Sequence, residues 1–348
     1  MKKCILGIMI CISFLAIGCS GETEETETEE ITEEKKDEIT IMHVDAEHPE
    51  FQKFIEEAEE ALDMEIHVTA CPENADNRQA KISTILSAGE TSVDIFSVND
   101  EMVSEFKYKG YLEPLNDRVM TEEIIACYPE SYIKNIAMLD GEIYSVPYYM
   151  DIMVFWVNKS MTGDQEIRTE EDFLRLLNTD FGEGKYGYGS AWDSAYASIF
   201  AYSGTMNTFV RAGAYREDFI QVAPLPEFAE NTTNIAAWQY VLNKASVHKE
   251  AAFRFLEYAA SREGSIAYSE YMNRLPARVD IIREEDLDIP GFGQLRDYVE
   301  NTRLRERPFS RNAMEDITSM GTLFQRYVLE EITQEEFCQK AQNITDNF

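Results

Sequence analysis

Three apolar runs decide the fold: ITIMHV (39–44), MEIHVTA (64–70) and VDIFSV (93–98). Each run is short and rich in β-branched residues, which is typical of a strand. Patterns with helical spacing separate them, over residues 49–62 and 77–88. Alternating strands and helices of this kind predict a parallel sheet with right-handed crossovers, and therefore an α/β fold.

Polar residues follow each of these strands. They are His43-Val44-Asp45, Ala70-Cys71 and Asn99-Asp100. In open α/β sheets, ligands bind outside the carboxyl ends of the strands. The sequence therefore predicts a ligand site at this edge of the sheet.

The rest of the chain continues the mixed pattern. We expect helices at 101–108, 122–137, 169–177, 194–203, 249–260, 263–272, 292–301, 312–329 and 334–345, and strands at 186–189, 219–223 and 234–242. Residues 142–157 are long and apolar, and we expect two strand pieces joined through Pro147, because proline cannot sit within a central strand. Thr169 is the predicted cap of its helix, with Asp172 three positions later.

The N-terminus has the features of an export signal. Two lysines precede an apolar stretch that is too short for a membrane span, and small residues then lead to Cys19. We predict a lipoprotein signal peptide over 1–18 and lipidation of Cys19; an ordinary secretory signal with a chance cysteine is the alternative. Residues 19–38 are dominated by Glu and Thr and are predicted to form a disordered tether, or an acidic interaction tail.

The composition excludes several classes of protein. The formal charge is −34, which argues against nucleic acid as a partner. Beyond Cys19, the cysteines Cys71, Cys127 and Cys338 fit neither a metal site nor a disulfide framework, so we expect buried free thiols, with one disulfide as the alternative. The four histidines are dispersed and predict no metal site.

Catalytic motifs are not recognisable in the sequence. No Ser, Cys or His lies in a nucleophile motif, and the glycines of residues 182–187 lack the spacing of a phosphate loop. Carboxylate pairs are too frequent in so acidic a chain to single out a glycosidase. We therefore expect a binding protein without a cofactor rather than an enzyme.

Several ordered blocks carry a resemblance to a known family. They are GYLEPL (110–115), DGEIYSVP (140–147), VFWVNK (154–159), VAPLP (222–226), EAAFRFL (250–256) and RLPAR (274–278). Together, over residues 39–348, they resemble extracellular solute-binding protein family 1, which includes maltose- and oligosaccharide-binding receptors. The resemblance implies a type II periplasmic-binding-protein-like fold, with two α/β lobes around a cleft.

The resemblance also implies how the lobes are divided. Residues 39–150 plus 238–306 would form lobe 1, and residues 151–237 plus 307–348 would form lobe 2. The chain would cross near Met150-Asp151, Asn234–Ala237 and Arg307-Pro308. Between Ser203-Gly204 and the block 209–213 the family usually has several dozen more residues, so the resemblance implies a shortened second lobe here.

The predicted ligand site follows from strand ends and crossings. Its residues are Asn99, Asp100, Tyr148, Tyr149, Asp151, Trp192, Asp193, Trp238 and Arg278. Tyr149 and Trp238 would stack on a sugar, and the three aspartates would accept hydrogen bonds from its hydroxyl groups. The competing interpretation is that an aromatic residue beside an apolar strand belongs to the core, which we favour for Phe155 and Trp156.

The sequence thus predicts a monomeric binding component of an ABC importer. It would sit lipid-anchored on the outer face of the cytoplasmic membrane and deliver a small solute, predicted to be a carbohydrate, to a permease. One alternative is a receptor for another solute such as a polyamine, which suits the acidic charge. Another is an envelope sensor or degenerate receptor without transport, as the shortened lobe suggests.

Overall fold

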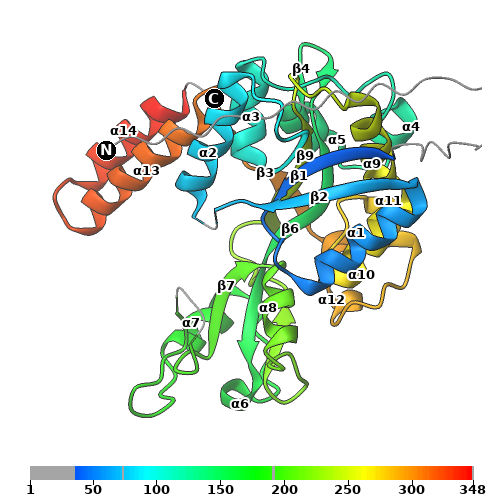
Figure 1. Ribbon diagram of the computed structural model, residues 1–348. Helices are drawn as coiled ribbons and strands as arrows, with labels where there is room; N and C mark the ends of the chain where they lie inside the picture. The colour runs from blue at the N-terminus through cyan, green and yellow to red at the C-terminus, as the bar shows by residue number, and fades with distance from the viewer. Residues whose placement is uncertain (1–35, 73, 190–192, 347–348) are drawn as a thin grey trace, which may run out of the picture. The chain divides into compact units, whose positions relative to one another are not determined.

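The computed structural model describes residues 36–72, 74–189 and 193–346 (Figure 1). The predicted signal peptide, Cys19 and most of the tether lie outside the described residues, as does Trp192. Among the described residues, the helices are all too short or too polar to cross a membrane.

The first three strands form the predicted parallel arrangement. β1 (Asp37–His43) lies between β2 (Met64–Ala70) and β3 (Ile95–Asn99) and pairs in parallel with both. The helices α1 (Pro49–Leu62) and α2 (Ala75–Ala88) connect them. Pro49 occupies the first turn of α1, and the Asn74 side chain accepts from the Asn77 N–H to cap α2. The α/β fold expected from these runs is confirmed.

Two long strands extend this sheet. β9 (Thr232–Leu242) pairs antiparallel with β3 on one side and with β6 (Val146–Asn158) on the other. The last part of β6 instead pairs with β7 (Ser198–Tyr202) and β8 (Ile220–Ala223), and β10 (Arg303–Glu306) pairs in parallel with β9. β6 therefore runs from the β1–β3 sheet into the part that holds α6 (Lys159–Thr162), α7 (Glu170–Leu177) and α8 (Thr205–Arg211) (Figure 1).

The remaining elements include most of the expected helices, together with helices over residues 159–162, 205–211 and 279–284 that the sequence did not predict. They are α3 (Asp100–Tyr108), α4 (Glu122–Ile125), α5 (Glu130–Tyr132), the π-helix η1 (Ile133–Ala137), β4 (Met138–Leu139), β5 (Glu142–Ile143), α6 (Lys159–Thr162), α7 (Glu170–Leu177), α8 (Thr205–Arg211), α9 (Lys249–Ala260), α10 (Arg262–Met272), α11 (Val279–Glu284), α12 (Phe292–Asn301), α13 (Ala313–Val328) and α14 (Gln334–Thr345). The capping box of α7 is present, because the side chains of Thr169 and Asp172 each accept from the other's backbone N–H.

Four local predictions were wrong. Residues 194–203 are not helical, because residues 198–202 pair with β6 as β7, and this tertiary pairing overrides local propensity. Pro147 lies inside β6 rather than between two strands, at a shift in the β6–β9 register. The helix expected at 122–137 is divided into three pieces, the second of which follows Pro129. Residues 186–189 contribute only two isolated bridges.

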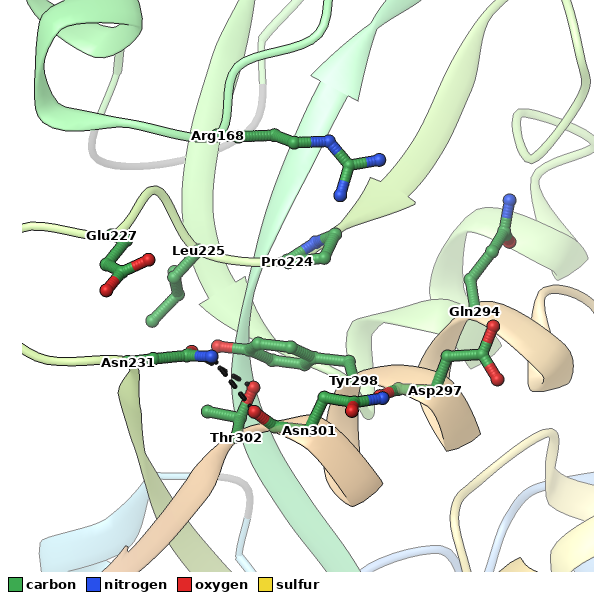
Figure 2. A pocket seen from close by; sticks show the side chains of 10 residues that line it. All are labelled: Arg168, Pro224, Leu225, Glu227, Asn231, Gln294, Asp297, Tyr298, Asn301 and Thr302. Atoms are coloured by element: carbon green, nitrogen blue, oxygen red, sulfur yellow. Dashed lines mark hydrogen bonds between the residues drawn. The ribbon is translucent and has the colours of Figure 1, made fainter.

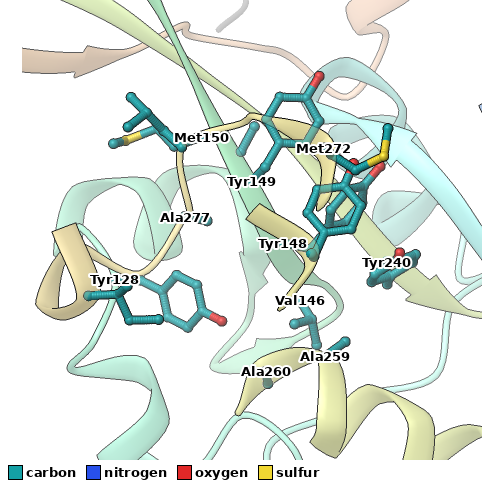
Figure 3. Packing of buried hydrophobic residues seen from close by; sticks show 14 of the residues in the cluster. Tyr128, Val146, Tyr148, Tyr149, Met150, Tyr240, Ala259, Ala260, Met272 and Ala277 are labelled. Carbon is teal, nitrogen blue, oxygen red and sulfur yellow. The ribbon is translucent and has the colours of Figure 1, made fainter. Parts of the chain in front are cut away.

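The main core surrounds the first half of β6 (Figure 3). The rings of Tyr148 and Tyr240 stack with their centroids 4.2 Å apart, and Tyr268 packs edge-on against Tyr148. The hydroxyl groups of Tyr148 and Ser97 are 2.8 Å apart and hydrogen-bonded. Phe155 and Trp156 are fully buried, which confirms the core interpretation for both.

The three described cysteines are free. Cys71 is buried as expected, but Cys127 is only half-buried and Cys338 is exposed.

The division of the chain into lobes remains a prediction. α13, which it assigned to the second lobe, lies beside α14 and packs against α3 (Figure 1).

Candidate functional site

An ion pair lies at the carboxyl end of β1. Arg274 donates from Nη1 and Nη2 to the two carboxylate oxygens of Asp45, over 2.5 and 3.0 Å. Both side chains are almost fully buried, at 11% and 6% exposed. Burial raises the pKa of Asp45, but the charge and hydrogen bonds of Arg274, together with the nearby His43 and His48, hold the pKa below its ordinary value.

A second carboxylate lies at the end of β3. Asp100 is fully buried, and its Oδ1 accepts from the Tyr132 hydroxyl, the Ala237 N–H and Gln239 Nε2. Arg307 Nη2 lies 3.3 Å from Asp100 Oδ2 and 3.2 Å from Glu101 Oε2. Burial raises the pKa of Asp100 to about 6, although the Arg307 charge acts in the opposite direction.

Two aromatic rings connect these charged groups. Trp238 of β9 is paired with Asn99 of β3 and with Tyr149 of β6, so the sheet register brings the two rings together. Their planes are 14° apart and their centroids 6.4 Å. The guanidinium carbon of Arg274 lies 4.6 Å from the centroid of the Tyr149 ring, and that of Arg78 lies 5.0 Å from the centroid of the Trp238 ring. Guanidinium groups thus cover part of the faces that the sequence assigned to sugar stacking.

Asp151 links β6 to the segment after β7. Its Oδ1 accepts from the Gly204 N–H at 2.7 Å and from the Ser203 hydroxyl at 3.1 Å. Burial raises its pKa to about 6, while these hydrogen bonds and the charges of Arg274 and Arg307 lower it. The charges of both arginines therefore act on the Asp151 carboxylate.

We call this group the strand-end cluster. It consists of Asp45, Arg78, Asn99, Asp100, Glu101, Tyr149, Asp151, Trp238, Arg274 and Arg307. Buried atoms of the cluster without a hydrogen-bond partner among the described residues include Asn99 Oδ1, Arg274 Nε and Arg307 Nε. Buried polar atoms are rarely left unpaired, so these atoms are candidate partners for water or for a polar ligand.

Of the nine predicted site residues, five belong to the cluster: Asn99, Asp100, Tyr149, Asp151 and Trp238. Tyr148 lies in the core. Asp193 is exposed and accepts from the Ala195 N–H of its own loop, and Trp192 is outside the described residues. Arg278 is buried elsewhere, where it donates to Asp280 and to the Ala260 carbonyl.

The sequence argument missed other members of the cluster. Asp45 follows β1 and was identified as a strand end, but it was not chosen. Arg274 opens the RLPAR block whose other arginine, Arg278, was chosen instead. Arg307 lies at the predicted third crossing. The signals were present, but nothing local distinguished these residues from their neighbours.

Several pockets lie among the described residues, and most of them are away from the cluster. One pocket of about 430 Å³ lies between the β8–β9 connection and α12 (Figure 2). Its lining contains Arg168, Glu227, Gln294, Asp297 and Tyr298. A smaller pocket of about 340 Å³ is lined in part by Arg307 and so adjoins the strand-end cluster.

One group of residues has ligand atoms at a spacing suitable for a metal. The ligand atoms of Glu38, Glu65 and His67 lie within 4.8 Å of one another on the β1–β2 surface. The group is largely exposed, and we find no further buried ligand for it among the described residues, so we assign no metal to it.

His43 lies in the core. Burial lowers its pKa to about 3, so the imidazole is neutral at pH 7, and its ring stacks on Phe51.

Comparisons with known proteins extend this description. Residues 53–197 match the family described as bacterial extracellular solute-binding protein. An uncharacterized ABC transporter extracellular-binding protein of Pyrococcus horikoshii is 27% identical over 186 residues, which cover 50% of this chain and 42% of that protein. The chain thus aligns with less than half the length of that relative.

Solved structures share the fold. A Thermotoga lettingae solute-binding protein bound to α-D-tagatose superposes with a TM-score of 0.72 at 18% identity, covering 89% of this chain and 98% of that one. A Listeria monocytogenes substrate-binding protein in complex with cycloalternan gives 0.72 at 16%, with the same coverage. Maltose-bound MalE3 of T. maritima gives 0.69 at 15%, covering 89% and 100%.

These comparisons confirm two predictions. The resemblance to extracellular solute-binding proteins is confirmed by the family match, and the two-lobed α/β fold by the structural matches. The matched family consists of binding proteins rather than enzymes, in agreement with the prediction of a non-enzyme.

Proposed function

We propose, taking the match to bacterial extracellular solute-binding proteins as the premise, that this chain is the solute-binding component of an ABC importer. It binds a carbohydrate at the strand-end cluster and delivers it to a membrane permease. Lipidation of Cys19 holds it on the outer face of the cytoplasmic membrane. We further propose that one copy of the chain provides the whole site.

The observation that carries the proposal is the composition of the strand-end cluster. Two nearly parallel aromatic rings lie beside the carboxyl end of β3, next to carboxylates and guanidinium groups held by fixed partners. Sugars present apolar C–H faces and a rim of hydroxyl groups, which aromatic rings and such polar groups recognise together. Trp238 is half-buried and is the better contact, because Tyr149 is only 4% exposed.

The charges of the cluster favour a neutral solute over a polyamine. Asp45 and Asp100 already have arginine partners, and Arg78 covers the Trp238 ring. A polycation would have to displace these guanidinium groups or approach them against like charge. Sugar hydroxyls can instead donate to the carboxylates and accept from the arginines. The structural neighbours bound to maltose, tagatose and cycloalternan support the same class.

The proposal is tested with the chain from Ser20 onward, which omits the predicted signal peptide and lipidated cysteine. Isothermal titration and thermal unfolding are measured with mono- and oligosaccharides, and with polyamines and amino acids as controls. A sugar at a hundredfold excess over its Kd should stabilise the fold by about 2.7 kcal/mol. If only polyamines bind, the solute is a cation rather than a sugar. If the protein unfolds cooperatively but no ligand changes its stability, the proposed receptor function is wrong.

A further inference from the structure

A buried ammonium group lies at the end of α3. Lys107 is only 4% exposed, and its Nζ donates to the carbonyl oxygens of Ile136 and Met138 over 2.5 and 3.0 Å. An ammonium group has three donors, so one N–H remains. Burial lowers the pKa of Lys107 to about 8, and no carboxylate among the described residues acts against this shift. The group is therefore protonated at pH 7 without the acidic partner that a buried charge ordinarily has.

This ammonium group borders the pocket of about 340 Å³ that adjoins the strand-end cluster. We call it the Lys107 pocket. Its charged and aromatic lining residues are Lys107, Tyr108, Lys134, Glu306, Arg307 and Phe309. Three of them are cationic and one is anionic, whereas the chain as a whole carries 65 acidic and 31 basic residues. The local charge of the pocket is thus opposite to that of the chain, which favours an anionic ligand.

Arg307 joins the Lys107 pocket to the strand-end cluster. Its Nη2 lies 3.3 Å from Asp100 Oδ2 and 3.2 Å from Glu101 Oε2, while its buried Nε has no hydrogen-bond partner among the described residues. Arg307 therefore brings an unused donor to the pocket, in addition to that of Lys107. Asp100 and Lys107 stand at the two ends of α3, about 10 Å apart along its axis, which is a span that an oligosaccharide can cover.

The other lining groups suit a sugar that carries one negative charge. The two carboxylate oxygens of Glu306 already accept from the Ser131 hydroxyl and the Asn135 amide. Tyr108 is 50% exposed and Phe309 is half-buried, so both rings are accessible to the apolar C–H face of a sugar. A phosphate would bring up to two negative charges close to Glu306, whereas a carboxylate brings one and is repelled less.

We propose that the Lys107 pocket binds a carboxylate group of the solute, which makes the solute an acidic sugar of the uronate class. The inference rests on the proposed sugar-binding function and specifies its substrate class. The strand-end cluster contacts the neutral rings and hydroxyl groups of the sugar. Lys107 and Arg307 pair with its carboxylate, and the ammonium group then has the anion that the described part of the chain does not supply.

The test compares each acidic sugar with its own methyl ester. Isothermal titration uses the chain from Ser20 onward with glucuronate, galacturonate and mannuronate, with their di- and trisaccharides, and with the methyl esters of the same compounds. Esterification removes the charge and leaves the ring and its hydroxyl groups unchanged. We expect a uronate to bind about tenfold to a hundredfold more tightly than its ester, because the ester cannot form the charged hydrogen bonds.

Two variants place the carboxylate in the pocket. Lys107→Met keeps a long side chain without its charge and should abolish the preference for the uronate over the ester. Lys107 also holds two carbonyl groups, so Lys134→Gln provides a second test at an exposed position. It should weaken uronate binding about two- to fivefold and leave ester binding unchanged. Lys53→Gln, at an exposed position of α1, is the matched control and should change neither affinity.

The outcomes separate this inference from the function on which it rests. If neutral sugars and esters bind as tightly as uronates, the receptor function stands and the carboxylate subsite is wrong. If the preference for a uronate survives in both Lys107→Met and Lys134→Gln, the carboxylate binds elsewhere. If inorganic phosphate alone stabilises the protein, and Lys107→Met loses this effect, the pocket holds a free anion rather than a sugar acid. If no sugar binds, the proposed function and the inference are both wrong.

Discussion

The strand-end cluster and the pocket between α12 and the β8–β9 connection differ in what fixes their side chains. In the cluster, Asp45 and Asp100 are buried and held by arginines. In the pocket, Arg168, Glu227 and Asp297 are exposed, and the amide of Asn231 is already bonded to its neighbours (Figure 2). Burying a charged group costs free energy unless the group is paired, so the charged groups of the cluster reduce stability unless their partners are present. The exposed charged groups of the pocket stay hydrated and have no such cost.

The largest difference between the two regions should appear on removal of an arginine. Arg274→Ala leaves Asp45 buried without its partner and should reduce the free energy of unfolding by about 3–5 kcal/mol. Arg168→Ala removes an exposed ion pair with Glu166 and should cost at most about 1 kcal/mol. Urea denaturation of both variants measures the contrast. If both variants lose the same free energy of unfolding, the buried pair contributes no more to stability than the exposed pair.

The pH dependence of stability offers a second contrast. The pKa of Asp151 is raised from 3.8 to about 6, so the folded state holds its proton more tightly than the unfolded state does. This stabilising effect is complete below pH 3.8 and is lost as the pH rises through 6. The two pKa values differ by about two pH units, which corresponds to up to ~3 kcal/mol between pH 4 and pH 7.

Asp151→Asn isolates this effect. Its amide oxygen can still accept from the Gly204 N–H, so the local geometry has no reason to change. We expect the stability of the wild type, relative to this variant, to fall between pH 4 and pH 7. If the stability of the two proteins changes with pH in parallel, the pKa of Asp151 is not raised in the folded state. Asp297→Asn, in the exposed pocket, is the control and should follow the wild-type curve.

Solute affinity provides a smaller but more specific contrast. Trp238→Ala removes the half-buried ring of the cluster and should weaken sugar binding roughly ten- to hundredfold, or about 1.4–2.8 kcal/mol. Asp193→Ala should leave the Kd unchanged, because Asp193 is exposed and bonded within its own loop. Titration calorimetry measures both. A loss with Asp193→Ala alone would move the site to the predicted residues that the structure separates from the cluster.

The sequence predicted those parts of the molecule whose signals are local. β1 to β3 and α1 follow from periodicity, a proline in the first helical turn and short apolar runs. Residues 198–202 were mistaken for helix because only their pairing with β6 makes them a strand. The choice of Arg278 over Arg274 failed for the same reason. The two arginines stand in one block, and only the fold brings Asp45, 229 positions away, to one of them.

The smallest expected effects are those in the pocket of Figure 2. Gln294→Ala removes an exposed amide whose contact is the Tyr215 hydroxyl at 3.3 Å, and it should change stability by no more than about 0.5 kcal/mol. Sugar affinity should not change either, since Gln294 and the cluster share no hydrogen-bond partner among the described residues and belong to different elements. Calorimetry on Gln294→Ala and Trp238→Ala, side by side, decides between the two regions. If binding survives the loss of the tryptophan and disappears with the glutamine, the open pocket is the solute site and the buried charges serve the fold.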